Sequence, residues 1–520
     1  MKFKKVLSVL SALTLLAGSV SGIAFAAEKG NGDVDQNGKV EIADAILLAR
    51  WLAEDNEISV TTAGLSEADM NGDGQVTADD NARLLCWLAG IPEEQPPERR
   101  SVDLLKGIEA SEGVKGKESD SAFVSAQSKF SVGLLKQALE KETDKDRNLL
   151  VSPLSVSLAL GMTMNGARGD TLTEMQNVLG GGLTADELNA YYKGWSDRLL
   201  KPETVWYYGY DEHGFFGDQQ AESAPVTLAN AIWIKDSEAE IQVPQSYLQT
   251  VVDFYKAGLF RAPFDQTTVD DVNGWCDENT HHMIPKVIDK LDPDAVMLLA
   301  NALTFEDVWA TQYEEYQVSD GTFTASNGES RDVKMMRSSE GVYLSDDEAI
   351  GFMKGYRDSR YSFAALLPNE DIAIDDYIAS LTGEKIDSLL HGRKYCDVNA
   401  AMPKFSFDYD IELSGALKAL GMPCAFGEGD APADFTGLNE APIEGSTKIG
   451  SVIHKTFIDV SESGTKAAAV TVVELCVESV IEDPPQPKIV RLDRPFVFMI
   501  LDNLTGLPLF IGTVKDVQAQ

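Results

Sequence analysis

Two acidic segments near the N-terminus carry side chains whose types and spacing suit a metal ion. They read DVDQNGKVEIAD (33–44) and DMNGDGQVTADD (69–80) and lie 36 residues apart. Each has oxygen-bearing side chains at its first, third and fifth places, a glycine at the sixth and a carboxylate at the twelfth. Calcium requires hard oxygen ligands of this kind around a tight turn. We therefore predict two Ca²⁺ ions, with these ligands: Asp33, Asp35, Asn37, the Lys39 carbonyl and Asp44 in the first loop, and Asp69, Asn71, Asp73, the Gln75 carbonyl and Asp80 in the second.

The elements that must position these ligands are predicted to be helices, one after each loop. The runs ADAILLARWLA and DNARLLCWLAG follow the two loops, and Trp-Leu-Ala at 51–53 recurs at 87–89. The repeat follows the EF-hand loop pattern, but it has Asp at the twelfth place and lacks a helix before the first loop. In these respects residues 30–92 resemble a dockerin module, which implies a small all-α domain.

The dockerin resemblance implies calcium-dependent docking to a cohesin module, as in the scaffold of a cellulosome. By the family's pattern the cohesin contacts lie late in each loop and on the helix that follows. Those positions differ between the two repeats, so the cohesin type and a dual binding mode stay open. The implied contact residues are Ile42, Ala43, Arg50, Ala78, Asp79 and Cys86.

Residues 1–26 have the composition of a secretory signal peptide. Lys2, Lys4 and Lys5 precede an apolar stretch, and the small residues AFA end at position 26. No second stretch of about 20 apolar residues follows, so no membrane span is expected. The formal net charge of -39 disfavours nucleic acid as a partner, because binding phosphates needs a basic patch. We predict a secreted protein, extracellular or held at the cell surface.

The rest of the chain is predicted to be a linker followed by one large domain. Residues 93–120 are rich in Pro, Glu, Lys, Ser and Gly, which predicts a linker; an ordered extension of a neighbouring domain is the alternative. From 121 to 520, helix-like and strand-like runs do not alternate strictly, which predicts an α+β fold. This domain has no G-x-S-x-G, HExxH, phosphate-loop or dinucleotide motif, so we predict that it is not an enzyme. A carboxylate pair of the glycosidase type among the 83 acidic residues is neither shown nor excluded.

The motifs of the large domain resemble those of one family, the serpins, and follow the family's order. The resemblance implies a monomeric α+β serpin fold with a central, mainly antiparallel sheet, about nine helices and an exposed reactive-centre loop. It also implies a polar cluster under the sheet, the shutter, at Ser152, Ser155, Asn301 and His454, and a tryptophan at the top of the sheet, the breach, at Trp309. The matching segments are NLLVSPLSVSLALGMTMNGARGDT, LANAIWI, LLANALTFEDVW, MPKFSFDYDIEL, IGSVIHKTFIDVSESGTKAAAVT and LDRPFVFMILDNLTGLPLFIGTV.

The segment GTKAAAVTVVELCVES, 464–479, corresponds to the reactive-centre loop. The resemblance implies that a protease cleaves this loop, which then inserts into the sheet as a strand and traps the protease as an acyl-enzyme. Alternate side chains of a strand face opposite ways, and the set that begins with Thr465 carries no charge; no proline interrupts 464–478. The implied hinge residues are Glu462, Gly464, Thr465, Ala467, Ala468 and Ala469.

The family's spacing places the reactive bond between Glu478 and Ser479, with a slip of one or two residues left open. Glutamate at this position disfavours trypsin-like proteases, because their specificity pocket holds a carboxylate. Glutamyl-specific, elastase-like and subtilisin-like serine proteases and cysteine proteases remain as target classes. Two other functions stay open: a non-inhibitory serpin with a binding or chaperone-like role, and a hydrolase docked to a cellulosome.

Overall fold

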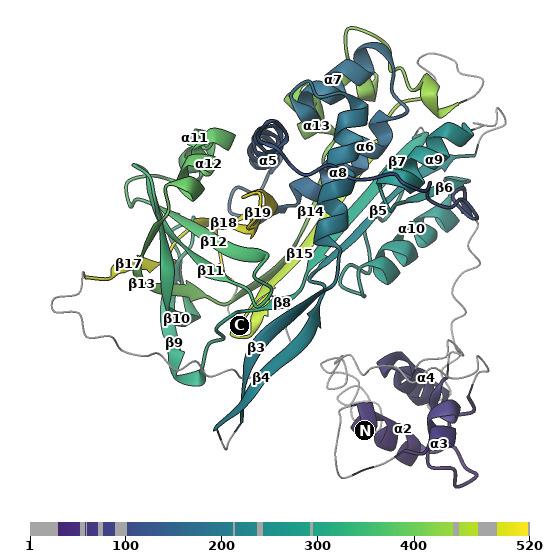
Figure 1. The fold of residues 1–520 in the computed structure, drawn as a ribbon, viewed down its shortest axis with the longest axis vertical. Coiled ribbons are helices and arrows are strands. Elements are labelled where there is room, and N and C mark those ends of the chain that lie inside the picture. Colours follow the sequence, from purple (N-terminus) through teal and green to yellow (C-terminus); the bar gives the residue numbers. More distant parts are fainter. Residues whose placement is uncertain are drawn as a thin grey trace. The chain divides into compact units, whose positions relative to one another are not determined.

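The computed structural model describes residues 30–52, 58, 60–70, 76–88, 101–211, 214–236, 243–291, 295–439, 447–465 and 486–517. The chain divides into two units, Met1–Glu98 and Arg99–Gln520 (Figure 1). Each unit has a hydrophobic core of its own. Among the described residues, no helix is both long and apolar enough to cross a membrane.

The smaller unit is all-α, as the dockerin resemblance implies. Its helices are α2 (Ile42–Leu52), α3 (Thr62–Ala68) and α4 (Ala78–Leu88). The apolar residues of α2 recur at helical spacing, and Leu48 of α2, Leu65 of α3 and Leu84 of α4 meet in one buried cluster. Helix α3 begins where the Thr61 hydroxyl accepts a hydrogen bond from the Gly64 N–H. This small core holds the two loops that precede α2 and α4.

The central sheet of the larger unit, sheet A, is mainly antiparallel, as expected. Its strands are β1 (Val102–Asp103), β5 (Val226–Lys235), β6 (Gly258–Ala262), β7 (Met297–Phe305), β8 (Asp307–Val308), β14 (Phe405–Glu412), β15 (Ser451–Val460) and β16 (Gly464–Thr465). Neighbours follow the order β1-β6-β5-β7-β15-β16-β8, and β14 pairs with β15. The pairs β5–β6 and β7–β15 are parallel, and the others are antiparallel.

A second sheet and a separate hairpin complete the strands. The second sheet has the order β17-β13-β10-β11-β12-β18-β19-β2, with β9 paired to β10; the hairpin joins β3 to β4. Their bounds are β2 Leu149–Val151, β3 Glu203–Asp211, β4 Gly214–Ser223, β9 Val318–Thr324, β10 Ser330–Ser345, β11 Ala349–Gly355, β12 Tyr361–Pro368, β13 Lys394–Pro403, β17 Lys488–Arg491, β18 Phe496–Asp502 and β19 Pro508–Val514.

The described part of the larger unit contains nine α-helices, which agrees with the expected number. They are α5 Ser121–Lys141, α6 Pro153–Met164, α7 Gly169–Gly180, α8 Ala185–Leu199, α9 Gln245–Phe254, α10 Gln266–Asn279, α11 Ile374–Ser380, α12 Gly383–His391 and α13 Ser414–Leu420; the 3₁₀ turns are Glu315–Gln317, Pro423–Phe426 and Thr436–Leu438. Ser152 caps the start of helix α6, Pro153 lies in its first turn, and every residue of the helix is buried.

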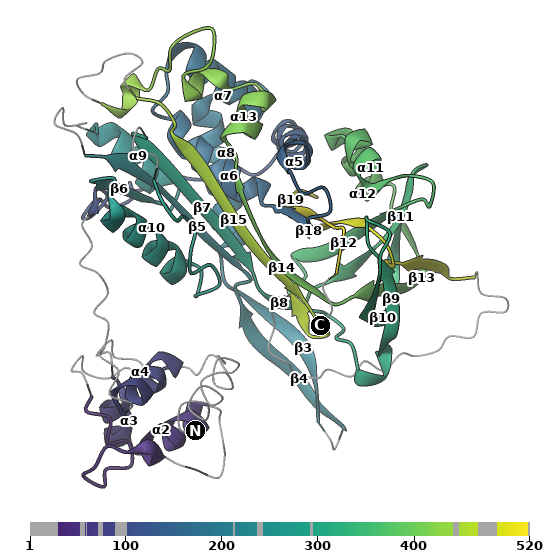
Figure 2. The same cartoon turned by 180° about the vertical axis from the view of Figure 1, so that it is seen from behind.

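Sheet A lies between two helical layers (Figures 1 and 2). Along β5, Ile232 and Ile234 belong to the main core that contains α6, whereas Ala231 and Trp233 belong to a second cluster that contains α10. Successive side chains of a strand point to opposite faces, so this division assigns α6 to one face and α10 to the other. The continuous apolar run of β5 is therefore buried on both faces.

Within the expected linker, 93–120, the described residues 101–120 make contacts with the rest of the larger unit. Val102 and Asp103 pair with Arg261 and Phe260 as an edge strand of sheet A. Further along, the Ser111 N–H donates to the Asp253 carboxylate at 2.7 Å. Both contacts use backbone groups of this segment, which its own side chains do not determine, so a polar composition did not reveal them. These contacts favour the alternative, an ordered extension of the neighbouring domain.

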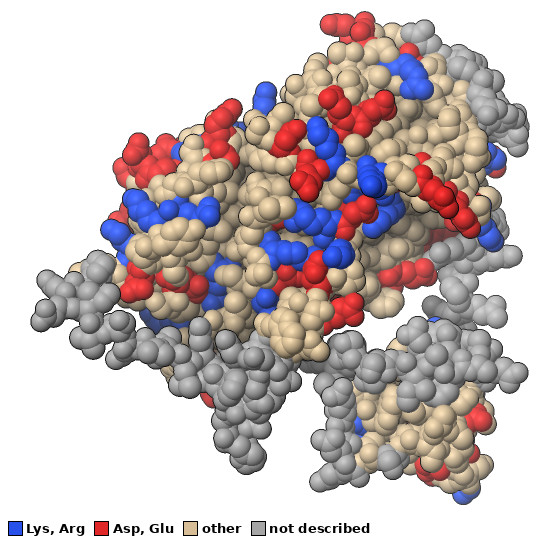
Figure 3. Space-filling model, viewed as in Figure 1, with Lys and Arg blue, Asp and Glu red and all other residues tan. Residues whose placement is uncertain are grey.

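Acidic and basic side chains are interspersed over the face of the larger unit that Figure 3 shows. A mixed pattern of this kind differs from the broad basic surface that nucleic acid binding needs. Three of the five cysteines are described: Cys276 and Cys424 are buried, Cys396 is half-buried, and all three are free thiols. Burial raises the pKa of the Cys276 thiol to about 12, so this thiol stays protonated and packs as an apolar group.

Candidate functional site

A buried polar cluster joins helix α6 to sheet A, and the four predicted shutter residues meet there. The Ser155 hydroxyl donates to Asn301 Oδ1 at 3.2 Å, and the same oxygen lies 2.5 Å from His454 Nδ1. The Ser152 N–H, at the start of α6, donates to His454 Nε2 at 2.9 Å. Two strands and one helix are thus tied by side chains that are at most 1% exposed.

His454 is neutral in this cluster, and its two ring nitrogens have fixed roles. Nε2 accepts the Ser152 N–H and carries no hydrogen, so Nδ1 donates to Asn301 Oδ1. Complete burial lowers the pKa of His454 to about 3, because a charged imidazolium would lose its hydration without gaining a counter-ion. Protonation would also break the bond from Ser152 and weaken the link between α6 and β15.

We expect the native protein to lose stability as pH falls below 6.5, and His454 to cause part of that loss. The unfolded chain binds a proton near the ordinary histidine pKa of 6.5, whereas the folded chain binds it only near pH 3. The contribution of neutral His454 to the free energy of unfolding is fully present above pH 6.5. It should therefore decrease by about 2 kcal/mol between pH 6.5 and 5. Urea unfolding at pH 7.5 and 5.0 measures this, with His454→Gln as the comparison. Equal pH dependence in both proteins would contradict this role.

Next to this cluster, strands β7 and β15 form a parallel pair that is incomplete at one end. They pair from Leu298 with Ser451 to Asn301 with His454. Beyond that point, Val460 of β15 pairs instead with Thr465 of the short strand β16. Strand β16 also pairs with β8, the continuation of β7, through Gly464 and Thr465. The start of the expected loop thus already lies in sheet A, antiparallel to both neighbours.

The two residues of β16 are held tightly. A Cβ on Gly464 would lie 2.1 Å from the Asp307 carbonyl oxygen and 2.6 Å from Val308 Cα, so the strands approach too closely for any side chain here. Thr465 is 2% exposed, and its hydroxyl lies 2.6 Å from the Tyr356 hydroxyl. Position 464 therefore requires a glycine, because there is no space for a side chain.

Trp309, the expected breach residue, holds the chain just before β16. Its backbone N–H donates to the Ser463 carbonyl and its indole Nε1 to the Ser461 carbonyl, both at 2.9 Å. Its ring stacks on Tyr356 with 4.6 Å between ring centroids. One buried aromatic pair therefore fixes both sides of the hinge: Trp309 binds the backbone before β16, and Tyr356 binds the Thr465 hydroxyl.

An ion pair closes the same region at the surface. Lys404 Nζ lies 2.9 Å from Glu462 Oε1, and both side chains are partly exposed. The Glu462 carbonyl also accepts the Tyr313 N–H at 3.1 Å. The predicted hinge residue Glu462 is therefore anchored through both its backbone and its side chain. The other hinge residues Ala467, Ala468 and Ala469 and the reactive-bond residues Glu478 and Ser479 lie outside the described residues.

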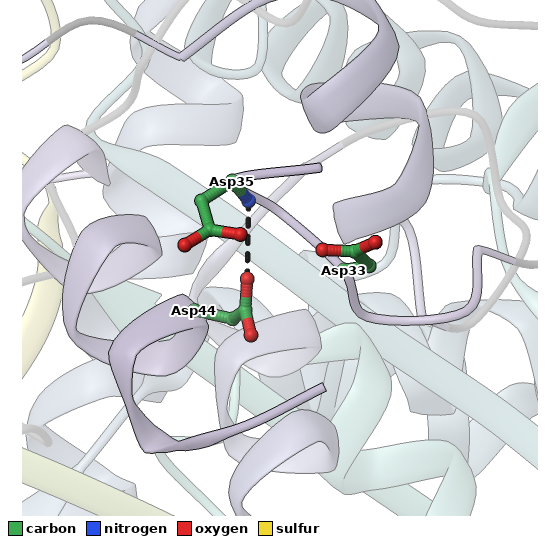
Figure 4. A group of neighbouring side chains, drawn as sticks. All are labelled: Asp33, Asp35 and Asp44. Atoms are coloured by element: carbon green, nitrogen blue, oxygen red, sulfur yellow. Dashed lines mark hydrogen bonds between the residues drawn. The ribbon is translucent and has the colours of Figure 1, made fainter. Parts of the chain in front are cut away.

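In the smaller unit, the first acidic loop brings three predicted ligands together (Figure 4). Asp33, Asp35 and Asp44 each offer a carboxylate oxygen, and these oxygens lie within 4.8 Å of one another. Gly38 at the sixth place has φ +83°, which the tight turn requires and which favours glycine. Asn37 Oδ1 accepts the Lys39 N–H at 2.9 Å, so the remaining predicted ligands lie in the same turn. This set of hard oxygen donors fits a calcium ion.

The second loop repeats the geometry of the first where the structure describes it. Asp80 Oδ2 accepts the Thr77 N–H at 2.8 Å, just as Asp44 Oδ2 accepts the Glu41 N–H at 2.9 Å in the first loop. Asp69, at the first place of the second loop, is fully buried. The predicted ligands Asn71, Asp73 and Gln75 lie outside the described residues. The two loops thus place their twelfth residue in the same way at the start of a helix.

The expected cohesin contacts on α2 lie on an exposed helix face. Ile42 is 57% exposed, and Ala43 and Arg50 are exposed too. Ile46, one turn from Ile42 and 55% exposed, belongs to the same face and was not singled out from sequence. The sequence does mark Ile46, because it follows Ile42 by four residues and so lies on the same face of the helix. Ala78, Asp79 and Cys86 lie on or at the start of α4, and their side chains are outside the described part of the chain.

Comparison with known proteins accounts for three features together: the incomplete β7–β15 pair, the start of the loop that lies in sheet A as β16, and the two calcium-type loops. Residues 125–517 match the family described as Serpin (serine protease inhibitor), over more than half of the chain. The chain belongs to the serpin family. Residues 31–85 match the Dockerin type I domain, so this serpin carries a dockerin at its N-terminus.

Relatives of this serpin cover nearly the whole larger unit. It is 28% identical over 398 residues to an uncharacterised serpin-like protein of Thermococcus kodakarensis (76% of this chain, 85% of the relative), and 28% identical over 406 residues to Iripin-2 of Ixodes ricinus (77% and 95%). The thermophilic serpin tengpin in its native state is 38% identical, with a TM-score of 0.70, covering 80% of this chain and all of that one. Latent tengpin gives a TM-score of 0.62 at 36% identity, with 78% of this chain and all of that one covered.

Three residues of the serpin site were not found from sequence. Asn230 of β5 pairs across the sheet with Asn301, and its side chain lies 3.3 Å from the Ser155 hydroxyl. The sequence does mark Asn230, because it is an amide residue within the otherwise apolar run LANAIWI. A similar run, LANALTF, surrounds Asn301. Tyr356 and Lys404 gave no local signal, because each contacts a hinge residue far away in the sequence.

Proposed function

We propose that this protein inhibits serine proteases, with cysteine proteases as a second target class, as a secreted suicide substrate. One observation carries the proposal: β16, the start of the loop, already lies between β15 and β8, antiparallel to both. The space that continues from β16 runs between β7 and β15, which are parallel to each other. A longer β16 could therefore extend along this line with hydrogen bonds on both sides.

The chemical step belongs to the protease. Its serine hydroxyl attacks the Glu478 carbonyl, an ester to the protease forms, and the Glu478–Ser479 peptide bond breaks. The leaving amine of Ser479 takes up a proton from the protease's general acid. Cleavage frees the chain from 466 to 478 to enter the sheet while the ester still holds the protease. The serpin is consumed and catalyses nothing.

Insertion is supported by the sequence that follows β16. After Thr465, alternate residues at 467, 469, 471, 473 and 475 are uncharged and face the same way in a strand, whereas Lys466 and Glu474 face the other way. The hinge alanines Ala467, Ala468 and Ala469 are small enough to pass between strands that are still close together. The first bonds to break would be those of the β7–β15 pair and of the shutter, Asn301 with His454 and Ser155.

We further propose that the dockerin binds two calcium ions and docks the serpin to a cohesin module of an extracellular scaffold. The Asp33, Asp35 and Asp44 carboxylates would hold one ion, with the Asn37 side chain and the Lys39 carbonyl. Asp69, Asn71, Asp73, Gln75 and Asp80 would hold the second. The ions would neutralise clustered carboxylates and fix the loops against α2 and α4. The exposed face with Ile42, Ala43, Ile46 and Arg50 would then contact the cohesin, and the serpin would act as a monomer.

A protease panel tests the inhibitory function. The full chain is mixed with subtilisin, elastase, a glutamyl endopeptidase and papain, and the products are separated on SDS gels. We expect an SDS-stable complex with at least one serine protease, and release of a C-terminal peptide that begins at Ser479. Clean cleavage without any stable complex would show a substrate rather than an inhibitor, and would favour the non-inhibitory serpin role.

A further inference from the structure

The turn at 356–360 joins β11 to β12 and lies along one edge of β8, the strand that pairs with the hinge. On this edge the Val308 carbonyl accepts the Arg357 N–H at 2.8 Å. Close by, the Ala310 N–H donates to the Gly355 carbonyl at 3.0 Å. On its other edge β8 pairs with β16. Backbone groups of successive residues in a strand point to opposite edges, so β8 lies between the turn and the hinge.

The turn also contacts the hinge directly, through Tyr356. The Tyr356 side chain is 2% exposed, and its hydroxyl lies 2.6 Å from that of Thr465. The Asp358 N–H donates to Asp307 Oδ2 at 3.0 Å, and Asp307 pairs with Thr465. A displacement of the turn would therefore disturb Thr465 both through its side chain and through the strand beside it.

Arg360 fixes this turn to the body of the larger unit. Asp358 is 2% exposed, and a carboxylate so deeply buried needs a positively charged partner. Arg360 supplies it, with Nε 2.9 Å from Asp358 Oδ1 and Nη2 2.5 Å from Asp358 Oδ2. Its Nη1 also donates to the backbone carbonyls of Arg198 and Lys201, at 3.1 and 2.8 Å. Carbonyls at the end of a helix lack partners within the helix, so one guanidinium joins the turn to the end of α8.

We propose that Arg360 is a positioning residue for loop insertion, because it holds the turn where Tyr356 and β8 keep Thr465 in sheet A. Arg360 makes no hydrogen bond to the described hinge residues, so it acts through the turn. Without the guanidinium, the buried Asp358 carboxylate would lose its partner and the turn would move toward water. The Tyr356 hydroxyl would then leave Thr465, and insertion would begin from a hinge that no longer lies in the sheet. The effect on trapping rests on the proposed inhibitory function, whereas the hold on the hinge does not.

The stoichiometry of inhibition tests the effect on trapping, with the full chain and a protease of the panel that forms a stable complex. Arg360→Ala should raise the stoichiometry about tenfold, because losing a hydrogen bond to a charged group shifts an equilibrium by this much. The matched control is Arg331→Ala, which removes a guanidinium of β10 that binds the Asp516 carboxylate by two hydrogen bonds, both at 3.0 Å. This control should behave as wild type. Arg360→Lys keeps the charge beside Asp358 without the planar fork, and it should recover part of the loss.

Amide hydrogen exchange distinguishes a hold on the hinge from a loss of overall stability. The N–H groups of Gly464 and Thr465 should exchange about tenfold faster in Arg360→Ala than in wild type, and at the wild-type rate in the control. Tyr356→Phe removes the hydroxyl that contacts Thr465 and should have a similar local effect. Because Arg360 acts through the turn that carries Tyr356, the double variant should exchange only slightly faster than Arg360→Ala. Effects that add fully would show that the two residues act independently and would overturn the inference.

The outcomes separate this inference from the proposed function. If wild type forms stable complexes, and Arg360→Ala matches Arg331→Ala in stoichiometry and in exchange at the hinge, the inference is wrong and the inhibitory function stands. If wild type forms no stable complex with any protease, the inhibitory function fails, and exchange at the hinge alone decides. Faster exchange in Arg360→Ala would then support the hold on Thr465, and unchanged exchange would overturn it. Where Arg360→Ala does not fold, Arg360→Lys serves the same comparison, and wild-type results for it in both measurements count against the inference.

Discussion

Replacing Thr465 by arginine is expected to convert this serpin from an inhibitor into a protease substrate. Thr465 is 2% exposed and lies in β16 between Val460 and Asp307, with its hydroxyl 2.6 Å from that of Tyr356. An arginine is too long for this enclosed position and would bury a charge, at a cost of several kcal/mol even beside the Asp307 carboxyl group. The hinge would therefore leave the sheet, and insertion after cleavage would start late or fail. Hydrolysis of the acyl-enzyme would then be faster than loop insertion, and the protease would be released.

The stoichiometry of inhibition and SDS gels measure this outcome with the same protease panel. We expect at least about tenfold more Thr465→Arg protein to be consumed per protease molecule, since 1.4 kcal/mol already changes the partition by a factor of ten. The matched control is Thr465→Ser, which is small, uncharged and keeps the hydroxyl that contacts Tyr356, and it should remain inhibitory. Stable complexes of Thr465→Arg at wild-type stoichiometry would show that Thr465 need not stay buried.

Removing calcium is expected to abolish cohesin binding and to unfold the smaller unit, while the larger unit stays folded. Without a cation, the carboxylates of Asp33, Asp35 and Asp44 repel one another with their oxygens within 4.8 Å. The core around Leu48, Leu65 and Leu84 is small, and a domain of about 60 residues is only marginally stable without the free energy of metal binding. EDTA should therefore raise the dissociation constant for a cohesin at least about 100-fold, as judged by titration calorimetry. Limited proteolysis should then cut within 30–92.

Single variants test the number of ions. Asp44→Ala and Asp80→Ala remove the twelfth ligand of one loop each, and each should reduce the bound calcium from two ions to one. Protease inhibition by both variants, and by the wild type in EDTA, should be unchanged because the predicted ligands all lie before residue 99. Cohesin binding that persists in EDTA would contradict the calcium-dependent docking.

The sequence predicted those site residues that lie in a recognisable local motif. The calcium loops repeat at a fixed offset, and Ser152, Ser155, Asn301 and His454 lie in motifs that match the serpin family. Contacts set by tertiary structure were not found. Tyr356 reaches Thr465 from 109 residues away, and the Lys404–Glu462 pair joins two separate segments. No local pattern marks either contact.

Two further differences arise from backbone hydrogen bonding rather than from side chains. The edge strand Val102–Asp103 is two residues long and lies in a polar stretch, so composition indicated a linker. The seating of Gly464 and Thr465 in sheet A could not be predicted either, because a loop that can insert has the same sequence before and after insertion. Under the proposed mechanism, the separation of β7 from β15 would decide between the two states.

The incomplete pair β7–β15 would accept any strand of suitable pattern, because nothing in a backbone hydrogen bond identifies which molecule supplies that strand. The loop of a second molecule could therefore occupy the space that the molecule's own loop would fill. Such a linkage would consume active inhibitor without a protease, and its rate would rise with protein concentration and with temperature. The incomplete strand pair that the proposed trapping mechanism requires would also limit how concentrated and how warm a stock of this protein can be kept.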